Sequence, residues 1–301
     1  MENLVTEQRN PASTDIDRKP TEEILKIINA EDKKVAYAVE KEIPKIAEAV
    51  DLIVDSIKKG GRLFFIGAGT SGRLGVMEAA EMPPTFGVNP ELVQGIIAGG
   101  IEALYRSLEG VEDDRNAGVK DLLSRGFASK DVLVGISASG KTPYTVAALE
   151  FAKKMGAKTI GITCNLNSEI AKIADVTIEV IVGPEVITGS TRMKAGTAQK
   201  MVLNMLTTAI MVKLGKVYEN LMVDLKAANE KLRERAKRII MSATNVSYDE
   251  AEKAINAAQG NVKAAILMIK TKVSYEEALR LLEKSGGILR KAIEEQEAKT
   301  L

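Results

Sequence analysis

The stretch from Arg62 to Gly87 constrains the fold more than any other part of the chain. It opens with an unbroken apolar run, Leu63 to Ile66, which is typical of a strand buried on both faces. Glycines and hydroxyl residues follow, and then a helix-forming segment that Ser71 can cap and that Pro83 and Pro84 are expected to end. A turn of this kind favours an anion, most often phosphate, because unpaired N–H groups and the positive end of the helix dipole converge there.

Apolar runs and helix-forming segments alternate through the middle of the chain. The predicted strands are Leu63–Ile66, Leu92–Ala98, Val132–Ile136, Thr159–Thr163 and Val176–Val182. The predicted helices between them are Ser71–Glu81, Ile101–Arg125, Thr142–Met155 and Asn167–Ile173. This alternation predicts an α/β fold with a five-stranded, parallel, doubly wound sheet, in which ligands bind at the carboxyl ends of the strands.

A second loop of the same character follows the third predicted strand and reads SASGKT, from Ser137 to Thr142. Its hydroxyl groups, its glycine and the helix start at Pro143 are what a phosphate site made of neutral donors needs. For one such loop, simple helix capping explains the same residues equally well. Two such loops in one sheet favour a bound phosphate. The candidate binding residues are Gly69, Thr70, Ser71, Ser137, Ser139, Gly140 and Thr142.

The first loop also matches the dinucleotide pattern G-x-G-x-x-G. That pattern requires an acidic residue about 20 positions later, at the end of the next strand, to hold the ribose hydroxyls. The next predicted strand ends Ile97-Ala98-Gly99 without a carboxylate, and Glu91 lies before the strand. A Walker phosphate loop is also absent, because Gly-Lys-Ser/Thr does not occur at the required spacing. A bound nucleotide is therefore the less favoured interpretation.

Composition limits the chemistry. The 301 residues contain no histidine and one cysteine, Cys164, which excludes a Ser-His-Asp triad, His-ligated zinc and thiolate clusters. We expect no metal or cofactor, and proton transfer by Glu, Asp, Lys or Tyr. A net charge of +1 gives no reason to expect nucleic acid or a membrane surface as a partner. The single thiol, the absence of a secretory signal and the lack of a long apolar run predict a cytoplasmic protein.

The two ends of the chain differ from the middle. The polar stretch up to Pro20 predicts a flexible arm, and helical patterns follow from Thr21 and from Val35. The tail contains a repeat, because the segments that start at Val246 and Val273 align without gaps. Each repeat opens with a Ser-x-x-Glu capping box and breaks at a glycine, which predicts paired helix hairpins resembling ubiquitin-associated domains. The residues concerned are Ser247, Glu250 and Gly260, then Ser274, Glu277 and Gly287. The predicted domains are 1–45, 46–225 and 226–301.

The two loops resemble those of the sugar isomerase (SIS) domain, which binds phosphosugars. Three longer runs resemble the N-acetylmuramic acid 6-phosphate etherases, and the resemblance covers nearly the whole chain. These runs are Gly67–Gly87, Glu109–Asp114 and Thr188–Lys200. The resemblance implies that Ser71, Ser137, Ser139 and Thr142 hold the sugar phosphate. It also implies that Glu81 is the proton donor and Glu112 a second active-site carboxylate. We expect a homodimer.

The activity that the resemblance implies is that of a carbon–oxygen lyase in amino-sugar catabolism and peptidoglycan recycling. Its substrate is N-acetylmuramic acid 6-phosphate, and its products are N-acetylglucosamine 6-phosphate and D-lactate. Our hypothesis makes Glu81 the acid and Glu112 the base. Judged from spacing alone, Glu112 is a first-turn acid favoured by a helix dipole, and Glu81 is a solvated residue roughly 15 Å along its helix.

Two matters stay open at this point. Ser190, Thr191 and Lys194 could contact the sugar or its carboxylate, although Lys194 could equally be an exposed helix residue. The same phosphate site would also serve an aldose–ketose phosphosugar isomerase or a non-catalytic phosphosugar-sensing regulator. Release of D-lactate from N-acetylmuramic acid 6-phosphate distinguishes the etherase from both alternatives.

Overall fold

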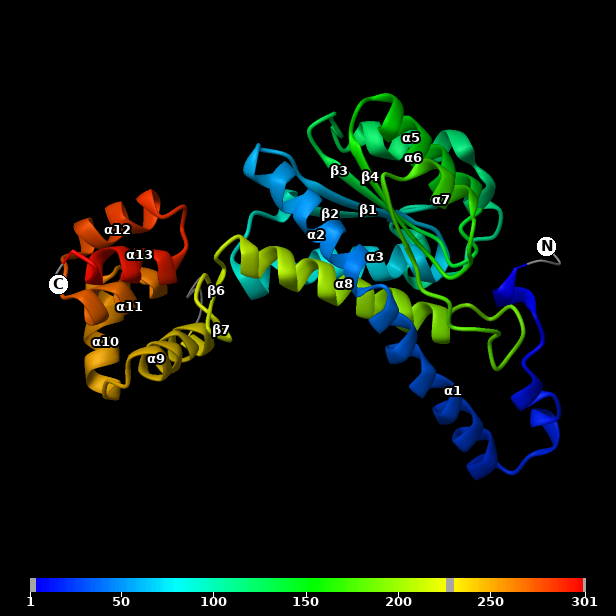
Figure 1. Ribbon diagram of the computed structural model, residues 1–301, viewed down its shortest axis with the longest axis horizontal. Coiled ribbons are helices and arrows are strands. Elements are labelled where there is room, and N and C mark those ends of the chain that lie inside the picture. Colours follow the sequence, from blue (N-terminus) through cyan, green and yellow to red (C-terminus); the bar gives the residue numbers. More distant parts are fainter. Residues whose placement is uncertain (1–3, 226–229, 300–301) are drawn as a thin grey trace. The chain divides into compact units, whose positions relative to one another are not determined.

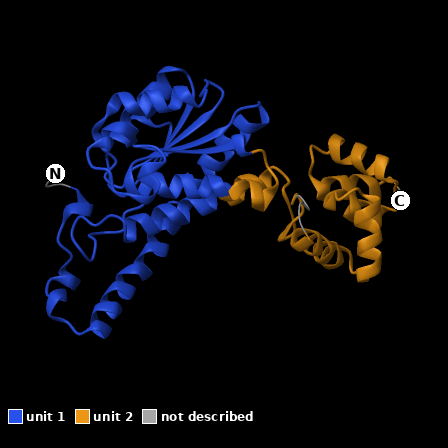
Figure 2. Ribbon diagram, turned by 180° about the vertical axis from the view of Figure 1, so that it is seen from behind, with its two compact units in different colours: residues 1–80, 90–207 blue, residues 81–89, 208–301 orange. Residues whose placement is uncertain are grey.

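The computed structural model describes residues 4–225 and 230–299. Its described residues form two compact units, those of 1–80 with 90–207 and those of 81–89 with 208–301 (Figure 2). Helices α3 (Gly69–Phe86) and α8 (Lys194–Lys213) each contribute residues to both units. The predicted domain limit at residue 226 falls in the range 226–229, outside the described residues, and the limit at residue 45 stays a prediction.

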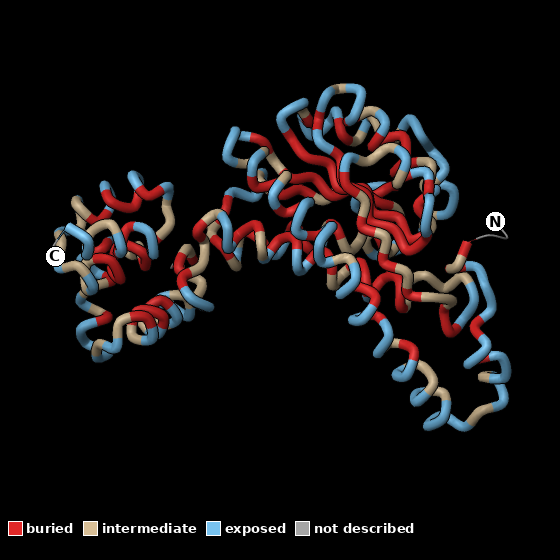
Figure 3. Tube along the Cα trace, viewed as in Figure 1, coloured by how far each residue is buried: buried red, intermediate tan, exposed pale blue. Residues whose placement is uncertain are grey.

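A five-stranded parallel sheet forms the centre of the first unit, with the strand order β2-β1-β3-β4-β5 (Figure 1). The strands are β1 (Leu63–Gly67), β2 (Val93–Ile97), β3 (Val132–Ile136), β4 (Lys158–Thr163) and β5 (Val176–Glu179). Every residue of β1 and β3 is buried, and Figure 3 shows the centre of the sheet as the most continuous buried region. The apolar runs in the sequence reflect this burial on both faces.

Helices cover both faces of the sheet (Figure 1). On one face lie α2 (Ile43–Lys58), α3 and α8, and on the other α5 (Arg115–Ser124), α6 (Pro143–Lys154) and α7 (Glu169–Ile173). Phe64 and Ile66 of β1 share a core with Leu149 of α6, whereas a Cβ atom at Gly75 of α3 would lie 2.9 Å from the Cβ atom of the intervening Phe65. The predicted α/β fold with a five-stranded doubly wound sheet is therefore confirmed.

The strand order creates a topological switch between β1 and β3. The chain goes from β1 outward to β2, and then returns to add β3 on the opposite side of β1. At such a switch the connections leave the sheet towards opposite faces, which opens a crevice at the carboxyl ends of the two strands. Both predicted phosphate loops start at this crevice, one after Gly67 and the other after Ile136.

Several predicted helix boundaries differ from the structure. The helix expected from Val35 does not start there, because α1 (Thr21–Lys41) continues to Lys41 and α2 begins at Ile43. Ser71, expected to cap α3, lies inside that helix, which begins at Gly69. Helix α3 continues to Phe86 with Pro83 and Pro84 inside its last turn, whereas the prolines were expected to end it. Proline lacks an N–H donor but its carbonyl still accepts, and the Gly87 N–H donates to the Pro83 carbonyl at 3.0 Å.

The predicted helix 101–125 is interrupted after Tyr105, where Arg106 has an extended backbone, and again at Gly110, whose φ is +83°. Its place is taken by α4 (Glu102–Tyr105), the 3-10 turn η5 (Val111–Asp113) and α5. A further 3-10 turn, η4 (Pro90–Leu92), precedes β2.

The predicted flexible arm is folded against the first unit. It forms the 3-10 turns η1 (Val5–Glu7), η2 (Pro11–Ser13) and η3 (Ile16–Arg18). Asn165, which follows β4, accepts from the Val5 N–H at 2.7 Å and donates to Thr6 Oγ1 at 3.1 Å. Its amide also donates to the Ala138 carbonyl in the second loop at 2.9 Å. The arm is therefore joined to the second phosphate loop through one buried side chain.

A buried ion pair fixes helix α1 (Thr21–Lys41). The Lys194 Nζ atom lies 2.6 Å from Glu31 Oε2, and the side chains are 1% and 4% exposed. Burial alone would raise the pKa of Glu31, but hydrogen bonds with Lys194, Lys34 and Asn10 outweigh it and lower the pKa to about 2. The pair therefore joins α1 to the first residue of α8.

The second unit is mainly helical among its described residues, and β6 (Val217–Tyr218) pairs antiparallel with β7 (Leu221–Met222). Its helices are α9 (Glu230–Thr244), α10 (Tyr248–Ala257), α11 (Val262–Thr271), α12 (Tyr275–Lys284) and α13 (Leu289–Glu297). Ser247 and Glu250 form the predicted capping box. Ser274 caps α12, but the Glu277 carboxylate binds Arg280 instead of closing the second box.

Removal of one partner of the Glu31–Lys194 pair should destabilise the protein more than removal of both. We expect Glu31→Met to lower the free energy of unfolding by about 3–5 kcal/mol, because Lys194 would remain charged and buried without a partner. The double variant Glu31→Met/Lys194→Met should recover most of this loss. Chemical denaturation at pH 7 measures both, and a double variant no more stable than the single one would contradict the expectation.

The pH dependence of the same pair follows from the depressed pKa of Glu31. Its contribution to stability is fully present above the ordinary glutamate pKa of 4.5 and is lost as the pH falls towards 2. The double variant should therefore lose less stability between pH 4.5 and 2 than the natural chain.

Substitution of Asn165 should release the arm while the sheet stays folded. In Asn165→Ala we expect the Val5 and Thr6 amides to lose hydrogen-exchange protection and unfolding to become easier by about 1–3 kcal/mol, because the arm loses its buried partners. Asn116→Ala, an exposed change on α5, is the control. Equal protection of the arm in both variants would show that Asn165 does not hold it.

Candidate active site

A pocket of about 320 Å³ lies at the crevice between the ends of β1 and β3. Its walls are Glu7, Ala68, Gly69, Thr70, Ser71, Ser107, Leu108, Glu109, Glu112, Ser137, Ala138, Ser139, Thr142 and Thr191. Seven of these residues carry hydroxyl groups and three carry carboxylates, and none of the described residues in the walls is Lys or Arg. An anion in this pocket would therefore be held by neutral donors.

The hydroxyl groups of the second loop bind one another. Ser137 Oγ lies 2.8 Å from Thr142 Oγ1 and 3.2 Å from Ser139 Oγ, and it accepts from the Gly140 N–H at 3.0 Å. Gly140 has a φ of +66°, and a Cβ atom there would lie 2.3 Å from the Cβ atom of Ser168. The tight turn therefore requires glycine and gathers three hydroxyl groups at one wall of the pocket.

Helix α6 starts from this loop without a side-chain cap. Thr142 occupies the N-cap position, but its hydroxyl binds Ser137 and accepts no bond from the first turn of the helix. In α5, by contrast, Asp114 accepts from two backbone N–H groups. The interpretation of the loop as an ordinary cap is therefore not supported at Thr142. The first-turn N–H groups of α6 and the positive end of its dipole can act on a ligand.

The first loop brings a second helix start to the same pocket. Helix α3 begins at Gly69, and Ser71 in its first turn donates from Oγ to Gln199 Oε1 of α8 at 3.0 Å. A Cβ atom at Gly72 would lie 2.6 Å from the Gly67 carbonyl oxygen, so this glycine allows close contact between helix and strand. The glycines of the motif thus bring the Ser71 hydroxyl to the pocket wall.

The third motif, before α8, differs in its role. Ser190 and Lys194 are not among the pocket walls, although Thr191 is. Lys194 binds Glu31, and the first backbone N–H groups of α8 donate to the buried carboxylate of Glu185 at 3.0 and 2.9 Å. This helix start already has an anion of its own. Contact of Ser190 or Lys194 with substrate stays a prediction, and the pairing of Lys194 favours a structural role.

Three carboxylates reach the pocket wall. Glu112 lies in η5, and because Asp114 caps the helix that follows, Glu112 is not needed as a first-turn acid. Glu109 accepts from the Ser107 hydroxyl at 2.8 Å. Glu7 comes from the N-terminal arm and was missed in the sequence analysis. No local pattern marks it, because its position depends on Asn165, about 160 residues away.

Glu81 is not among the residues of the pocket walls. It is exposed on α3 and belongs to the segment 81–89 of the second unit. The other glutamate of this helix, Glu78, is buried, accepts from Thr207 Oγ1 at 2.5 Å and pairs with Lys200. Glu78 thus has a structural role, and the role of Glu81 as a proton donor stays a prediction.

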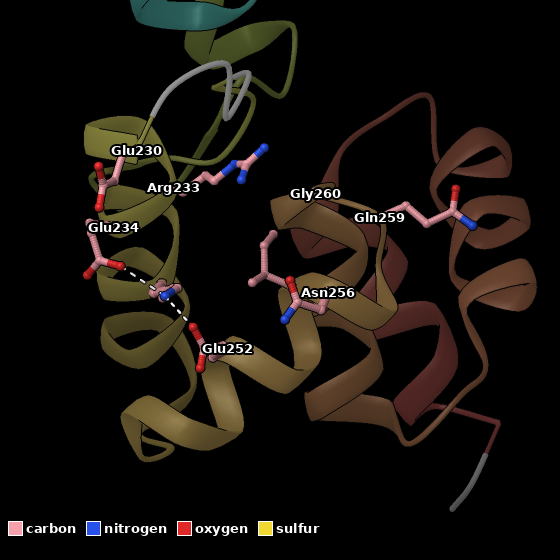
Figure 4. A pocket seen from close by; sticks show the side chains of 9 residues that line it. Glu230, Arg233, Glu234, Glu252, Asn256, Gln259 and Gly260 are labelled. Carbon is pink, nitrogen blue, oxygen red and sulfur yellow. Dashed lines mark hydrogen bonds and ion pairs between the residues drawn. The ribbon is translucent and has the colours of Figure 1, made fainter.

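Two other pockets have different chemistry. One of about 520 Å³ lies in the second unit, and Figure 4 shows charged side chains from α9 and α10 around it. Its Lys237 is already bound to Glu234 at 2.9 Å and Glu252 at 2.5 Å. A pocket of about 300 Å³ beside β2 is lined largely by apolar residues such as Ile101 and Leu104. Among the described residues, neither pocket has more than one Ser or Thr in its walls.

Three further features of the described ranges 4–225 and 230–299 bear on the chemistry of the chain. No helix there combines the length and the apolar character that crossing a bilayer requires. No three His, Cys, Asp or Glu side chains within those ranges are placed to hold a metal ion. Burial, and secondly the charge of Glu185, raise the pKa of the Cys164 thiol to about 12, so it stays protonated at neutral pH.

Comparisons with known proteins agree with this geometry. Residues 45–153 match the family model of the glucokinase regulatory protein N-terminal SIS domain, and residues 121–209 match that of the SIS domain. Three relatives, each named N-acetylmuramic acid 6-phosphate etherase, match most or all of the chain. The relative from Clostridioides difficile (strain 630) is 61% identical over 266 residues, which are 88% of each chain.

The other two relatives extend over nearly the full length. The protein from Clostridium beijerinckii is 54% identical over 299 residues, 99% of this chain and 98% of its own. The protein from Geobacillus sp. (strain WCH70) is 54% identical over 294 residues, 98% of this chain and 100% of its own. The chain therefore belongs to the N-acetylmuramic acid 6-phosphate etherase family.

Proposed function

We propose that this protein cleaves the lactyl ether of N-acetylmuramic acid 6-phosphate and releases N-acetylglucosamine 6-phosphate and D-lactate. Membership of the etherase family supports the reaction. The observation that carries the proposal is the uncapped start of α6, where Ser137, Ser139 and Thr142 direct hydroxyl groups into one pocket. These donors, with Ser71 at the start of α3, suit the phosphate of the sugar.

The chemistry that we propose is an elimination followed by hydration. Ring opening gives a C1 aldehyde, which acidifies the proton on C2. Glu112, on the pocket wall, takes this proton, and the electron pair forms the C2–C3 double bond as the C3–O bond breaks. Protonation of the leaving oxygen gives D-lactate, and water then adds at C3 to give the product sugar.

Glu81 is our proposed donor of the proton to the leaving oxygen. Its support is the resemblance of the run from Gly67 to Gly87, together with its position on the helix that begins at the first phosphate loop. Glu7 and Glu109, the other two acids of the pocket wall, are suited to accept hydrogen bonds from the sugar.

We also propose that the protein acts as a cytoplasmic homodimer. Large apolar side chains are exposed on α1 and at the start of α2, with Leu25 60%, Tyr37 68% and Ile43 49% exposed, which suits a subunit contact. Cys164 is a free thiol, which fits a reducing compartment.

Loss of one hydroxyl group from the second loop should weaken phosphate binding. We expect Thr142→Val to raise KM, and the inhibition constant of inorganic phosphate, about 10- to 100-fold, because a hydrogen bond to a charged oxygen is lost. Thr145→Val is the control, because Thr145 lies on the same helix, is buried and has no partner for its hydroxyl group among the described residues. Equal phosphate inhibition in both variants would contradict the proposed site.

The acid and the base can be separated by isotope exchange in D₂O. Glu112→Gln should lower kcat for lactate release about 100- to 10,000-fold and slow exchange of the C2 proton to the same extent, because the base is lost. Glu81→Gln should also release almost no lactate, yet still introduce deuterium at C2 of the recovered substrate. Mass spectrometry of the substrate and an assay of D-lactate measure both steps. Exchange in Glu112→Gln but not in Glu81→Gln would reverse the two roles.

A further inference from the structure

Gln199 of α8 binds the first phosphate loop through Ser71, and one end of its side-chain amide has no hydrogen-bond partner among the described residues. Its side chain is almost fully buried, at 1% exposure, and its Oε1 atom accepts the hydrogen bond from Ser71 Oγ at 3.0 Å. Its Nε2 atom is also buried and has no hydrogen-bond partner among the described residues. Buried N–H groups without a partner are rare in folded proteins, so this amide requires an explanation.

The number of hydrogens at the Ser71 hydroxyl suggests an explanation for the unpartnered amide. A serine hydroxyl carries a single hydrogen, and here Ser71 donates it to Gln199. The dianion of a sugar phosphate has only acceptor oxygens, so Ser71 cannot donate to it while it donates to Gln199. With the amide in this orientation, the hydrogen that should bind the ligand is directed at Gln199 instead.

Rotation of the Gln199 amide by about 180° resolves both problems. The oxygen and the nitrogen of an amide have nearly the same size, so the rotation needs little additional space. Nε2 would then donate to Ser71 Oγ, and the Ser71 hydrogen would be free to bind a phosphate oxygen. The Gln199 oxygen would take the position of the unpartnered nitrogen, where a carbonyl without a full set of donors is tolerated better than an N–H group.

The surrounding contacts hold Gln199 and Ser71 beside each other. Helix α8 contacts the first loop at a neighbouring position, where a Cβ atom at Gly196 would lie 3.3 Å from Thr70 Cγ2. Farther along the same two helices, Glu78 of α3 binds Lys200 and Thr207 of α8. Gln199 itself is not part of the pocket wall, whereas Ser71 is.

We propose that Gln199 is a positioning residue whose amide, with Nε2 donating to Ser71 Oγ, holds the Ser71 hydroxyl in place and leaves its hydrogen free for the bound phosphate. The inference rests on the proposed function only in taking phosphate as the group that enters the pocket. It predicts that Gln199 affects ligand binding through Ser71 and through no other residue.

A double-mutant cycle on phosphate binding tests this inference. The variants are Gln199→Met, Ser71→Ala and the double variant, and the probes are inorganic phosphate and N-acetylglucosamine 6-phosphate, measured by calorimetry. Gln94→Met is the control, because Gln94 is a buried glutamine on β2 whose amide donates to the Glu91 carbonyl and which does not line the pocket. Thermal unfolding of each variant is measured alongside.

We expect Gln199→Met to weaken binding of both probes about tenfold, and to have no further effect once Ser71 is alanine. Gln199→Glu should weaken binding more strongly, because a carboxylate can only accept and therefore keeps the Ser71 hydrogen. Its deficit relative to the natural chain should shrink between pH 8 and pH 6, because a protonated carboxyl group can donate. If Gln199→Met does not fold, Gln199→Asn, which is too short to reach Ser71, takes its place in the cycle.

Two results would overturn the inference. One is full additivity of the Gln199 and Ser71 effects on binding. The other is loss of thermal stability in Gln199→Met with unchanged phosphate affinity, which would mark a purely structural role. Because binding is measured without turnover, normal phosphate coupling in a protein that released no D-lactate would refute the proposed reaction and leave this inference standing.

Discussion

The pairing of β1 with β3 in a parallel register determines where the two phosphate loops of the pocket lie. Gly67 at the end of β1 is the register partner of Ile136 at the end of β3, so both strands reach the crevice at the same level. Two helices therefore begin side by side, and their first-turn N–H groups and hydroxyl side chains face one small volume. The glycines of the loops serve this arrangement, because Gly72 and Gly140 lie where any larger side chain would collide with its neighbours.

Buried charge in the first unit is used for structure and is kept out of the phosphate loops. Glu185 accepts two backbone N–H groups at the start of α8, Glu31 holds Lys194, and Glu78 binds Lys200 and Thr207. Each of these carboxylates has its own donors, which offsets the cost of burial. The acids of the pocket wall are different, because they come from short turns and from the arm and remain suited to substrate.

The sequence predicted those parts of the fold that local patterns specify. Apolar runs located the five strands, and the loops after β1 and β3 located Thr70, Ser71, Ser137, Ser139 and Thr142, all of which line the pocket. Contacts between distant residues were not predictable in this way. Glu7 reaches the pocket because Asn165 binds Val5 and Thr6, and Lys194 turns away from it because Glu31 lies on α1. The end of α3 was predicted too early at the prolines, because the Pro83 carbonyl still accepts a hydrogen bond in the last turn.

The absence of Lys and Arg from the described pocket walls affects how a ligand reaches them. The attraction of a full positive charge extends over about a Debye length, whereas the field of aligned peptide dipoles is felt mainly within the first helical turn. With a net charge of only +1, the chain as a whole adds little long-range attraction for a dianion. Capture of phosphate would thus depend on close fit at contact and not on long-range attraction, so the pocket can stay selective in a medium crowded with other anions.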